Sequence, residues 1–210
     1  MKLFFPISEQ RTAASEQVYR LMYVGRMIAL KGLPEFLQTL KKWAEDHPQR
    51  SLEFAMVGDG PLRAEIEAAN WPANLKIVCH GHIPFHKVAE IYLTADLSVF
   101  PTLSEEWGCA VNEALATGLP MLGSVYSQGV EELIKDDVNG WQMRPDDLAA
   151  TYKVLDKALN SSKAARERMI QAAKRTVEPL TEEYIADLIE GAVYTVLNEG
   201  TRKIEAGKGG

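Results

Sequence analysis

Short runs of β-branched and aliphatic residues alternate with helical patterns along the first two thirds of the chain. This alternation predicts a parallel sheet, because parallel neighbours need long crossover connections that helices supply. The runs that predict strands are Arg20–Val24, Leu52–Val57, Leu75–Cys79, Leu97–Phe100, Pro120–Gly123 and Trp141–Met143. We therefore expect an α/β fold with a doubly wound parallel sheet of about six strands and helices on both faces.

Helical patterns fill the intervals between these strands. They are Leu33–Glu45, Pro61–Ala69, His86–Thr94, Cys109–Ala116 and Val130–Ile134. After Asp146 the pattern is wholly helical, at Asp147–Leu159, Lys163–Thr176 and Thr181–Asn198. We predict one domain over residues 20–199, which closes with these C-terminal helices, and a disordered tail over residues 200–210.

Composition excludes several classes of function. The net charge is −6 and no basic cluster is present, so nucleic-acid binding is not expected. No apolar run approaches the length of a membrane span. Cys79 and Cys109 are the only cysteines and form no CxxC pair, which favours a reducing, cytoplasmic compartment.

The loops that follow the strands are where a ligand is expected. In open α/β sheets, ligands bind outside the carboxyl ends of the strands, where the strand order reverses. The loops in question are residues 25–32, 58–61, 80–85, 101–108 and 124–129. Candidate site residues are therefore sought in these five segments and at the helix starts that follow them.

Two carboxylates, Glu105 and Glu113, lie eight positions apart around Trp107 and Gly108. A helix that starts near Gly108 would direct unpaired N–H groups and a partial positive charge at a ligand above the sheet. This arrangement suits a ligand with phosphate and hydroxyl groups, such as a nucleotide-sugar. Glu113 would accept hydrogen bonds from a ribose diol, and Glu105 would bind sugar hydroxyls near the reacting carbon. Alternatively, both are ordinary surface and first-turn acids, and the residues alone leave this open.

Arg26 and Lys31 lie in the loop after the first predicted strand. An arginine presents a planar fork to phosphate oxygens and a lysine acts as a mobile point charge. Together they could neutralise a diphosphate without a metal. The alternative is a pair of solvated loop cations, but their place beside the end of the first strand favours the phosphate interpretation.

One glycine motif in this region resembles a cofactor fingerprint but lacks essential parts. Gly58-Asp59-Gly60-Pro61 begins like a dinucleotide-binding sequence, yet Arg63 occupies the third glycine position. No strand-end acid stands about twenty residues further on. We therefore predict no NAD site and no other cofactor, and interpret the glycines as a tight strand-to-helix turn.

Three histidines, His80, His82 and His86, could suggest a metal site. Gly81 and Pro84 interrupt any regular geometry between them, and no acidic or cysteine partner is fixed nearby. We predict no metal there, and expect instead a strand-end loop whose backbone could read a nucleobase.

The same residues resemble the donor-binding half of retaining glycosyltransferases of family four, also called glycosyl transferases group 1, which have the GT-B architecture of two Rossmann domains. The resemblance covers residues 20–145 in the expected order. It is carried by Gly25-Arg26, Lys31-Gly32, Val57-Gly58-Asp59-Gly60-Pro61, Cys79-His80-Gly81, Ala95-Asp96, Pro101, Glu105, Trp107-Gly108, Glu113-Ala114, Gly118, Pro120 and Asn139-Gly140. It implies that the chain is a Rossmann-like domain and one half of a GT-B enzyme.

The resemblance also implies roles for single residues. Glu105 would contact the donor sugar and Glu113 the ribose, while Arg26 and Lys31 would hold the diphosphate. Glu105, Arg26 and Lys31 are thus the expected catalytic set. The remaining expected substrate contacts are the backbone of the central helix start at Trp107, Gly108, Cys109 and Ala110, and the base-reading loop at His82 and Ile83.

Four positions depart from the family pattern. Thr102 stands for serine, Trp107 for phenylalanine, Glu106 for glycine, and Ser127-Gln128-Gly129 for a more glycine-rich turn. We expect these changes to affect which donor sugar is bound more than whether a donor is bound.

Leu3-Phe4-Phe5-Pro6 resembles the end of the linker between the two Rossmann domains. We therefore expect residues 1–19 to be a linker remnant, and the chain to be an excised or naturally truncated C-terminal half. The acceptor-binding N-terminal domain would be the missing partner, so this half would be inactive alone. Peripheral contact with the inner membrane through the missing half is left open.

The whole enzyme would transfer a hexosyl unit from a nucleotide-diphosphate sugar to a glycan or lipid-linked acceptor, without a metal, in polysaccharide biosynthesis. Two other functions are left open by the sequence. One is half of a nucleotide-sugar 2-epimerase, which shares the two-domain architecture. The other is a non-catalytic module that binds a nucleotide-sugar and regulates a partner.

Overall fold

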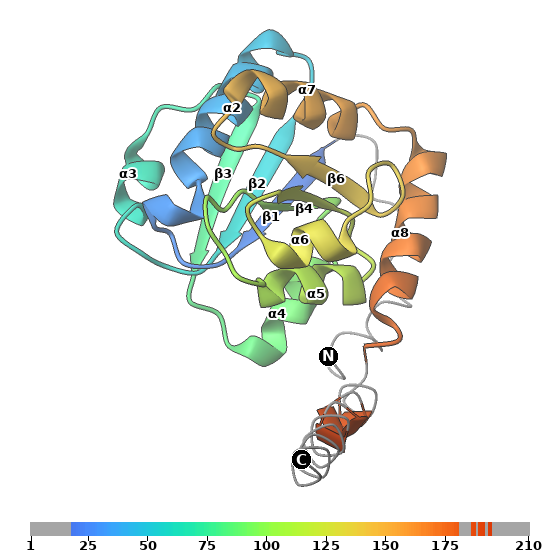
Figure 1. Cartoon of the computed structure of the whole chain (residues 1–210). Coiled ribbons are helices and arrows are strands. Elements are labelled where there is room, and N and C mark those ends of the chain that lie inside the picture. The colour runs from blue at the N-terminus through green and yellow to red at the C-terminus, as the bar shows by residue number, and fades with distance from the viewer. Residues whose placement is uncertain (1–17, 181–185, 188, 192, 195–210) are drawn as a thin grey trace, which may run out of the picture. The chain divides into compact units, whose positions relative to one another are not determined.

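A computed structural model describes residues 18–180, 186–187, 189–191 and 193–194 (Figure 1). The chain divides into two compact units, Met1–Val177 and Glu178–Gly210. Most of the predicted linker (residues 1–17) and the predicted tail (200–210) lie outside the described residues. Of the helix predicted at Thr181–Asn198, residues 186–187, 189–191 and 193–194 are described, and they are helical.

The first unit is built on a six-stranded parallel sheet with the order β3-β2-β1-β4-β5-β6. Its strands are β1 (Tyr19–Val24), β2 (Leu52–Val57), β3 (Leu75–Gly81), β4 (Leu97–Phe100), β5 (Met121–Ser124) and β6 (Gly140–Met143). The predicted doubly wound fold and all six predicted strands are confirmed. Because the strand order reverses between β1 and β4, the loops after these two strands flank a switch point, where such sheets bind ligands.

Helices cover both faces of this sheet (Figure 1). They are the 3-10 helix η1 (Ala29–Lys31) and the α-helices α2 (Leu33–Asp46), α3 (Arg63–Ala68), α4 (Phe85–Tyr92), α5 (Cys109–Ala116), α6 (Gln128–Leu133), α7 (Leu148–Leu159) and α8 (Lys163–Val177). The predicted helices are present with shifted ends: α3 begins after a turn at Pro61 and Leu62, and α6 begins at Gln128. η1 was not predicted, because three residues are too few to show helical periodicity.

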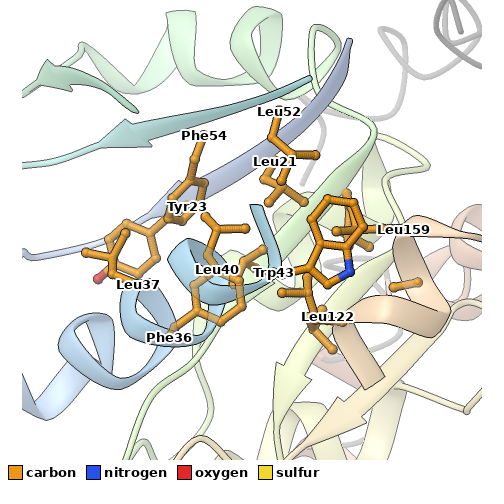
Figure 2. Close-up of a cluster of buried hydrophobic side chains, with 14 of the residues drawn as sticks. Leu21, Tyr23, Phe36, Leu37, Leu40, Trp43, Leu52, Phe54, Leu122 and Leu159 are labelled. Atoms are coloured by element: carbon orange, nitrogen blue, oxygen red, sulfur yellow. The ribbon is translucent and has the colours of Figure 1, made fainter. Parts of the chain in front are cut away.

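A cluster of buried hydrophobic side chains lies between α2 and the sheet (Figure 2). Phe36, Leu40 and Trp43 follow helical spacing and are fully buried against strand residues such as Leu21 and Phe54. Burial of side chains of this size stabilises a fold by roughly 1.5–3 kcal/mol each. This packing fixes the start of α2, and therefore the loop between β1 and α2 that carries two of the predicted site residues.

Candidate functional site

The loops after β1 and β4 are in backbone contact at the switch point. The N–H of Leu103 donates to the carbonyl of Leu30 at 2.9 Å. The hydroxyl of buried Thr102 donates to the same carbonyl at 3.3 Å and to that of Ser104 at 2.9 Å. Thr102 therefore keeps the hydroxyl of the serine that it replaces in the family pattern, and uses it to hold the two loops together.

Gly32 allows the close approach of these loops. It has φ of +63°, and an added Cβ would lie 1.9 Å from the carbonyl oxygen of Pro101. A side chain at this position would meet both backbone strain and a steric clash. The glycine therefore lets Lys31 and the segment after Pro101 share one site.

Lys31 and Glu105 form an ion pair across these loops, between Nζ and Oε2. The side chains are 14% and 26% exposed, so the pair is sheltered but open to a ligand. The backbone N–H of Glu105 donates to the carbonyl of Tyr126 at 3.0 Å, which ties the carboxylate-bearing loop to the loop after β5. Two residues assigned to one site from sequence are thus in direct contact, although they are 74 positions apart.

Arg26 lies in the same β1 loop, with an exposed side chain. Its guanidinium makes no ion pair or hydrogen bond to other described residues, but its backbone is fixed. The hydroxyl of buried Tyr23 donates to the carbonyl of Arg26 at 2.7 Å. Burial raises the pKa of Tyr23, so this phenol remains a neutral donor at physiological pH. Arg26 therefore combines an anchored backbone with a side chain that extends into solvent.

The segment from Trp107 to Ala110 forms the start of α5. The N-cap Gly108 has φ of +90°, and an added Cβ would lie 2.7 Å from the ring of Phe100. No side chain caps this helix start, which leaves its first N–H groups available to a ligand. Cys109 is exposed and Ala110 partly exposed, so ligand access to this backbone is not blocked.

Hydrogen bonds fix both the side chain and the backbone of Trp107. Its indole N–H donates to Oδ1 of Asn112 at 2.7 Å, and the ring is 37% exposed. Its carbonyl accepts from the hydroxyl of Ser127 at 2.6 Å and from the N–H of Gly129 at 3.2 Å. An added Cβ at Gly129 would lie 2.4 Å from that carbonyl oxygen. The turn at residues 127–129 therefore keeps glycine at the position that contacts the α5 start.

Glu113 lies in the second turn of α5 and is largely buried. The phenol of Tyr92, which is fully buried in α4, donates to Oε2 of Glu113 at 3.2 Å. Burial raises the pKa of Glu113 above its ordinary value, and the hydrogen bond from Tyr92 opposes that shift. Burial, with the Glu113 carboxylate beside it, also raises the pKa of Tyr92, which keeps the phenol protonated as a donor.

His82 and Ile83 follow the end of β3, with His82 exposed and Ile83 partly buried. The N–H of Gly58 donates to the carbonyl of Gly81 at 2.8 Å, so the loops after β2 and β3 adjoin. Among the described residues, no hydrogen bond or ion pair links His82 or Ile83 to Lys31 or Glu105. The predicted base-reading loop therefore belongs to the same sheet edge, but it is not bonded to the switch-point pair.

The glycines of the Gly58–Pro61 motif allow the β1 and β2 loops to touch. A Cβ added to Gly58 would lie 2.0 Å from the carbonyl oxygen of Gly25. A Cβ added to Gly60 would lie 2.4 Å from the carbonyl oxygen of Met27. Between them, the N–H of Gly60 and then the guanidinium of Arg63 hold the pKa of Asp59 below its usual range. Besides the strand-to-helix turn predicted from the sequence, contact between the β1 and β2 loops therefore requires glycine at these two positions.

Within the described part of the chain, no three His, Cys, Asp or Glu side chains form a group able to hold a metal ion. His80 and His82 are exposed, and the side chain of His86 lies outside the described part. In the same described part, no helix combines the length and the apolar character that crossing a membrane requires.

Two hollows lie over α2, away from the strand ends. One of about 260 Å³ lies between α2 and α3, and another of about 720 Å³ lies between α2 and α7. None of the site residues predicted from the sequence lines either hollow. We place the candidate site at the switch point, because the charged side chains, the uncapped helix start and the glycine contacts meet there.

Sequence reasoning did not find Tyr92, Tyr23 or Asn112 as parts of this site. Tyr92 precedes its partner Glu113 by 21 positions and lies on a different helix, so no local motif connects them. Tyr23 reads as an ordinary apolar strand residue, and its role depends on where the chain turns after β1. The spacing of Trp107 and Asn112 could have suggested their contact, because both flank the predicted helix start.

The sequence of the chain is similar to those of known proteins. The sequence model of the family described as glycosyl transferases group 1 matches residues 5–176. A 2-deoxystreptamine N-acetyl-D-glucosaminyltransferase of Streptomyces fradiae is 27% identical over 173 residues, which cover 81% of this chain and 40% of that protein. The chain thus spans about 40% of the length of curated relatives that it matches.

Solved structures share the fold at low sequence identity. Sucrose-phosphate synthase from Thermosynechococcus elongatus has a TM-score of 0.70 and 21% identity, covering 95% of this chain and 51% of that one. The C-terminal domain of a glycosyl transferase group 1 family protein from Francisella tularensis has a TM-score of 0.64 and 20% identity. There the match covers 84% of this chain and 95% of the other.

Proposed function

The chain belongs to the glycosyl transferases group 1 family, and from that premise we propose that it binds a nucleotide-diphosphate sugar as the donor half of a retaining glycosyltransferase. The observation that carries this proposal is the ion pair between Lys31 and Glu105. A cation suited to phosphate and a carboxylate suited to sugar hydroxyls meet at the switch point, beside the uncapped start of α5.

In this proposal the diphosphate recruits Lys31 and the exposed Arg26. Lys31 then exchanges Glu105 for phosphate oxygens, and Glu105 becomes available to the hydroxyls of the donor sugar. The N–H groups at the start of α5, from Gly108 to Ala110, add fixed donors for the phosphates. The same ion pair would thus keep both side chains in place before the donor arrives.

The nucleoside would extend towards the loops after β2 and β3. Glu113 would accept hydrogen bonds from the ribose diol, and backbone at His82 and Ile83 would contact the base. The exposure of His82 and the partial exposure of Ile83 support this assignment. Glu113 lies on the helix whose start would hold the phosphates, which is consistent with a ribose attached to them.

The reaction would be transfer with retention of the anomeric configuration. The bond between the sugar and the diphosphate would break, the acceptor oxygen would bond to the anomeric carbon on the face that the diphosphate leaves, and the hydroxyl proton would pass to the leaving diphosphate. Arg26, Lys31 and the helix start would stabilise the negative charge on the leaving diphosphate, and Glu105 would stabilise positive charge near the reacting carbon. Because Arg26, Lys31 and the helix start supply positive charge themselves, we propose that donor binding needs no divalent metal.

The acceptor side is proposed to come from an N-terminal Rossmann domain, since relatives are more than twice as long as the matched region. The unit transferred would be a hexosyl group, and the acceptor a glycan or lipid-linked glycan. A relative whose name specifies N-acetylglucosaminyl transfer supports the hexosyl class. Cytoplasmic location stays a prediction, supported by the free thiols of Cys79 and Cys109.

Calorimetric titration of residues 1–210 with UDP, GDP and ADP tests donor binding. We expect one of them to bind, and Lys31→Ala and Arg26→Ala each to weaken that binding by about tenfold or more, because charge-assisted phosphate contacts are lost. Lys42→Ala is the matched control, since Lys42 is an exposed cation paired with Asp46 on α2. No binding of any of the three nucleotides, or equal affinity in both loop variants and the control, would overturn the proposal.

The same titration in chelator and then in excess magnesium tests metal independence, which complete dependence on magnesium would contradict. A radiolabelled transfer assay then separates the two halves of the enzyme. We expect no transfer by residues 1–210 alone, because a half-open cleft leaves the donor in solvent and lacks acceptor groups. Transfer should appear when an N-terminal domain from a relative is supplied. Robust transfer by residues 1–210 alone would contradict the half-enzyme proposal.

A further inference from the structure

We propose that Tyr92 is a positioning residue for ribose recognition: from α4 it holds the carboxylate of Glu113 in the orientation that the ribose diol requires. The inference rests on the proposed function of Glu113 and adds a residue outside the strand-end loops. It begins from one contact, the hydrogen bond from the phenol of Tyr92 to Oε2 of Glu113 at 3.2 Å.

The contact is directional because its donor cannot move freely. Tyr92 is fully buried and lies in the last turn of α4, so its ring is fixed by the surrounding core. Described residues donate no hydrogen bond to the other carboxylate oxygen, Oε1, of Glu113. One oxygen thus accepts from the Tyr92 phenol, and the second is assigned to the ribose.

The chemistry of the donor matters as much as its place. A neutral phenol stabilises the carboxylate without cancelling its charge, whereas a lysine partner such as that of Glu105 would compete with the ligand. A ribose diol offers two neutral O–H donors and binds best to a charged acceptor held at a fixed angle. Tyr92 therefore supplies orientation, while the negative charge remains available to the ribose.

The hydroxyl of Tyr23 provides a contrast within the same molecule. It is also buried, but it donates to the carbonyl of Arg26, which is a backbone group on the diphosphate side of the site. Loss of that hydroxyl would disturb the β1 loop and leave Glu113 unchanged. A Tyr23→Phe variant is therefore matched to Tyr92→Phe in burial and chemistry, but differs in which part of the ligand it should affect.

The test compares a nucleoside diphosphate with its 2′,3′-dideoxy analogue by calorimetry. The probe is whichever of UDP, GDP and ADP binds the wild-type chain most tightly. We expect the wild type to prefer the ribose form by about tenfold or more, because two hydrogen bonds to a charged group are absent from the analogue. Tyr92→Phe should reduce this preference by about threefold to tenfold and leave affinity for the dideoxy form nearly unchanged.

Tyr23→Phe should keep the wild-type preference for the ribose form, even if it lowers the affinity for both ligands. Glu113→Asp is a second variant that leaves the buried tyrosine intact: it retains the charge but moves the carboxylate away from the phenol, and should lose preference as Tyr92→Phe does. A wild-type preference retained in Tyr92→Phe or in Glu113→Asp would overturn the inference while leaving the proposed function intact. Failure of the wild type to bind any of the three nucleotides would overturn both.

Discussion

The two carboxylates of the candidate site, Glu105 and Glu113, lie on one continuous segment but are held in opposite ways. Glu105 lies in a loop and is paired with a cation from a different loop, while Glu113 lies on a helix and accepts a hydrogen bond from a buried neutral phenol. An ion pair can be exchanged when a phosphate competes for the lysine. A phosphate carries no donor that would replace a phenol, so we expect the hydrogen bond from Tyr92 to persist when the ligand binds.

We therefore expect the Lys31–Glu105 contact to rearrange on ligand binding and the Tyr92–Glu113 contact to stay as it is. The Lys31–Glu105 pair depends on the docking of two loops, and each partner is expected to exchange the other for part of the donor. The Tyr92–Glu113 pair joins side chains of two helices, α4 and α5, and is expected to be the same with and without nucleotide. The diphosphate and sugar end of the site would therefore adjust to the ligand, while the ribose end would select it.

The largest expected effect comes from breaking the loop docking that the first pair needs. Gly32→Ala would place a Cβ 1.9 Å from the carbonyl oxygen of Pro101, at a φ of +63° that alanine rarely adopts. We expect the free energy of unfolding to fall by about 2–4 kcal/mol, measured by urea denaturation. Gly191→Ala is the control, because an added Cβ there meets nothing within 4 Å. Equal stability of the two variants would show that the loops are not held as described.

The next effect separates the two carboxylates by ligand. Glu113→Gln should weaken the binding of a nucleoside diphosphate and of its sugar conjugate alike, by roughly 1–2 kcal/mol, because Glu113 contacts the ribose that both contain. Glu105→Gln should weaken the binding of the conjugate only, because Glu105 contacts the sugar. Glu45→Gln, at an exposed carboxylate on α2 outside the site, is the control for charge alone. Equal losses of nucleoside diphosphate affinity in Glu105→Gln and Glu113→Gln would remove the distinction between the two ends of the site.

Features that depend on local sequence patterns could be predicted, whereas contacts between residues far apart in the sequence could not. The strand and helix patterns predicted the sheet and therefore which loops share an edge, and the motif residues around Gly108 and Lys31 marked the switch point. The Tyr92–Glu113 contact was not predictable, because it depends on where the fold places the end of α4 relative to α5, and no local spacing encodes that. Likewise, the sequence placed Lys31 and Glu105 in one site but did not indicate that they pair with each other.

A smaller effect should appear in the pH dependence of nucleotide binding. Burial raises the pKa of Glu113, so protonation begins at a higher pH than for an exposed glutamate. A protonated carboxyl loses acceptor capacity, and affinity for a nucleoside diphosphate should therefore fall as the pH is lowered through that raised pKa. The 2′,3′-dideoxy analogue carries the same phosphates and serves as the control. A ratio of the two affinities that does not change with pH would mean that Glu113 does not bind the ribose as a carboxylate.

The smallest effect concerns the stability of the empty protein. Because the pKa of Glu113 is raised in the folded state, its protonated form favours folding, and that contribution is present below the unfolded-state pKa. It is lost as the pH rises through the folded-state pKa, so at neutral pH the largely buried charge destabilises the fold. Glutamine is neutral at every pH and can still accept the hydrogen bond from Tyr92. Glu113→Gln should therefore raise the melting temperature at neutral pH, by an amount equivalent to less than about 1 kcal/mol.

That gain should vanish when the wild type is measured at a pH low enough to protonate Glu113. Glu106→Gln, which replaces an exposed carboxylate, should show no comparable difference between the two pH values. Thermal unfolding of both variants and the wild type at neutral and acidic pH would measure the effect. If Glu113→Gln were less stable than the wild type at neutral pH, the carboxylate would be contributing to the fold. Its place beside Tyr92 would then be explained by stability rather than by ribose selection.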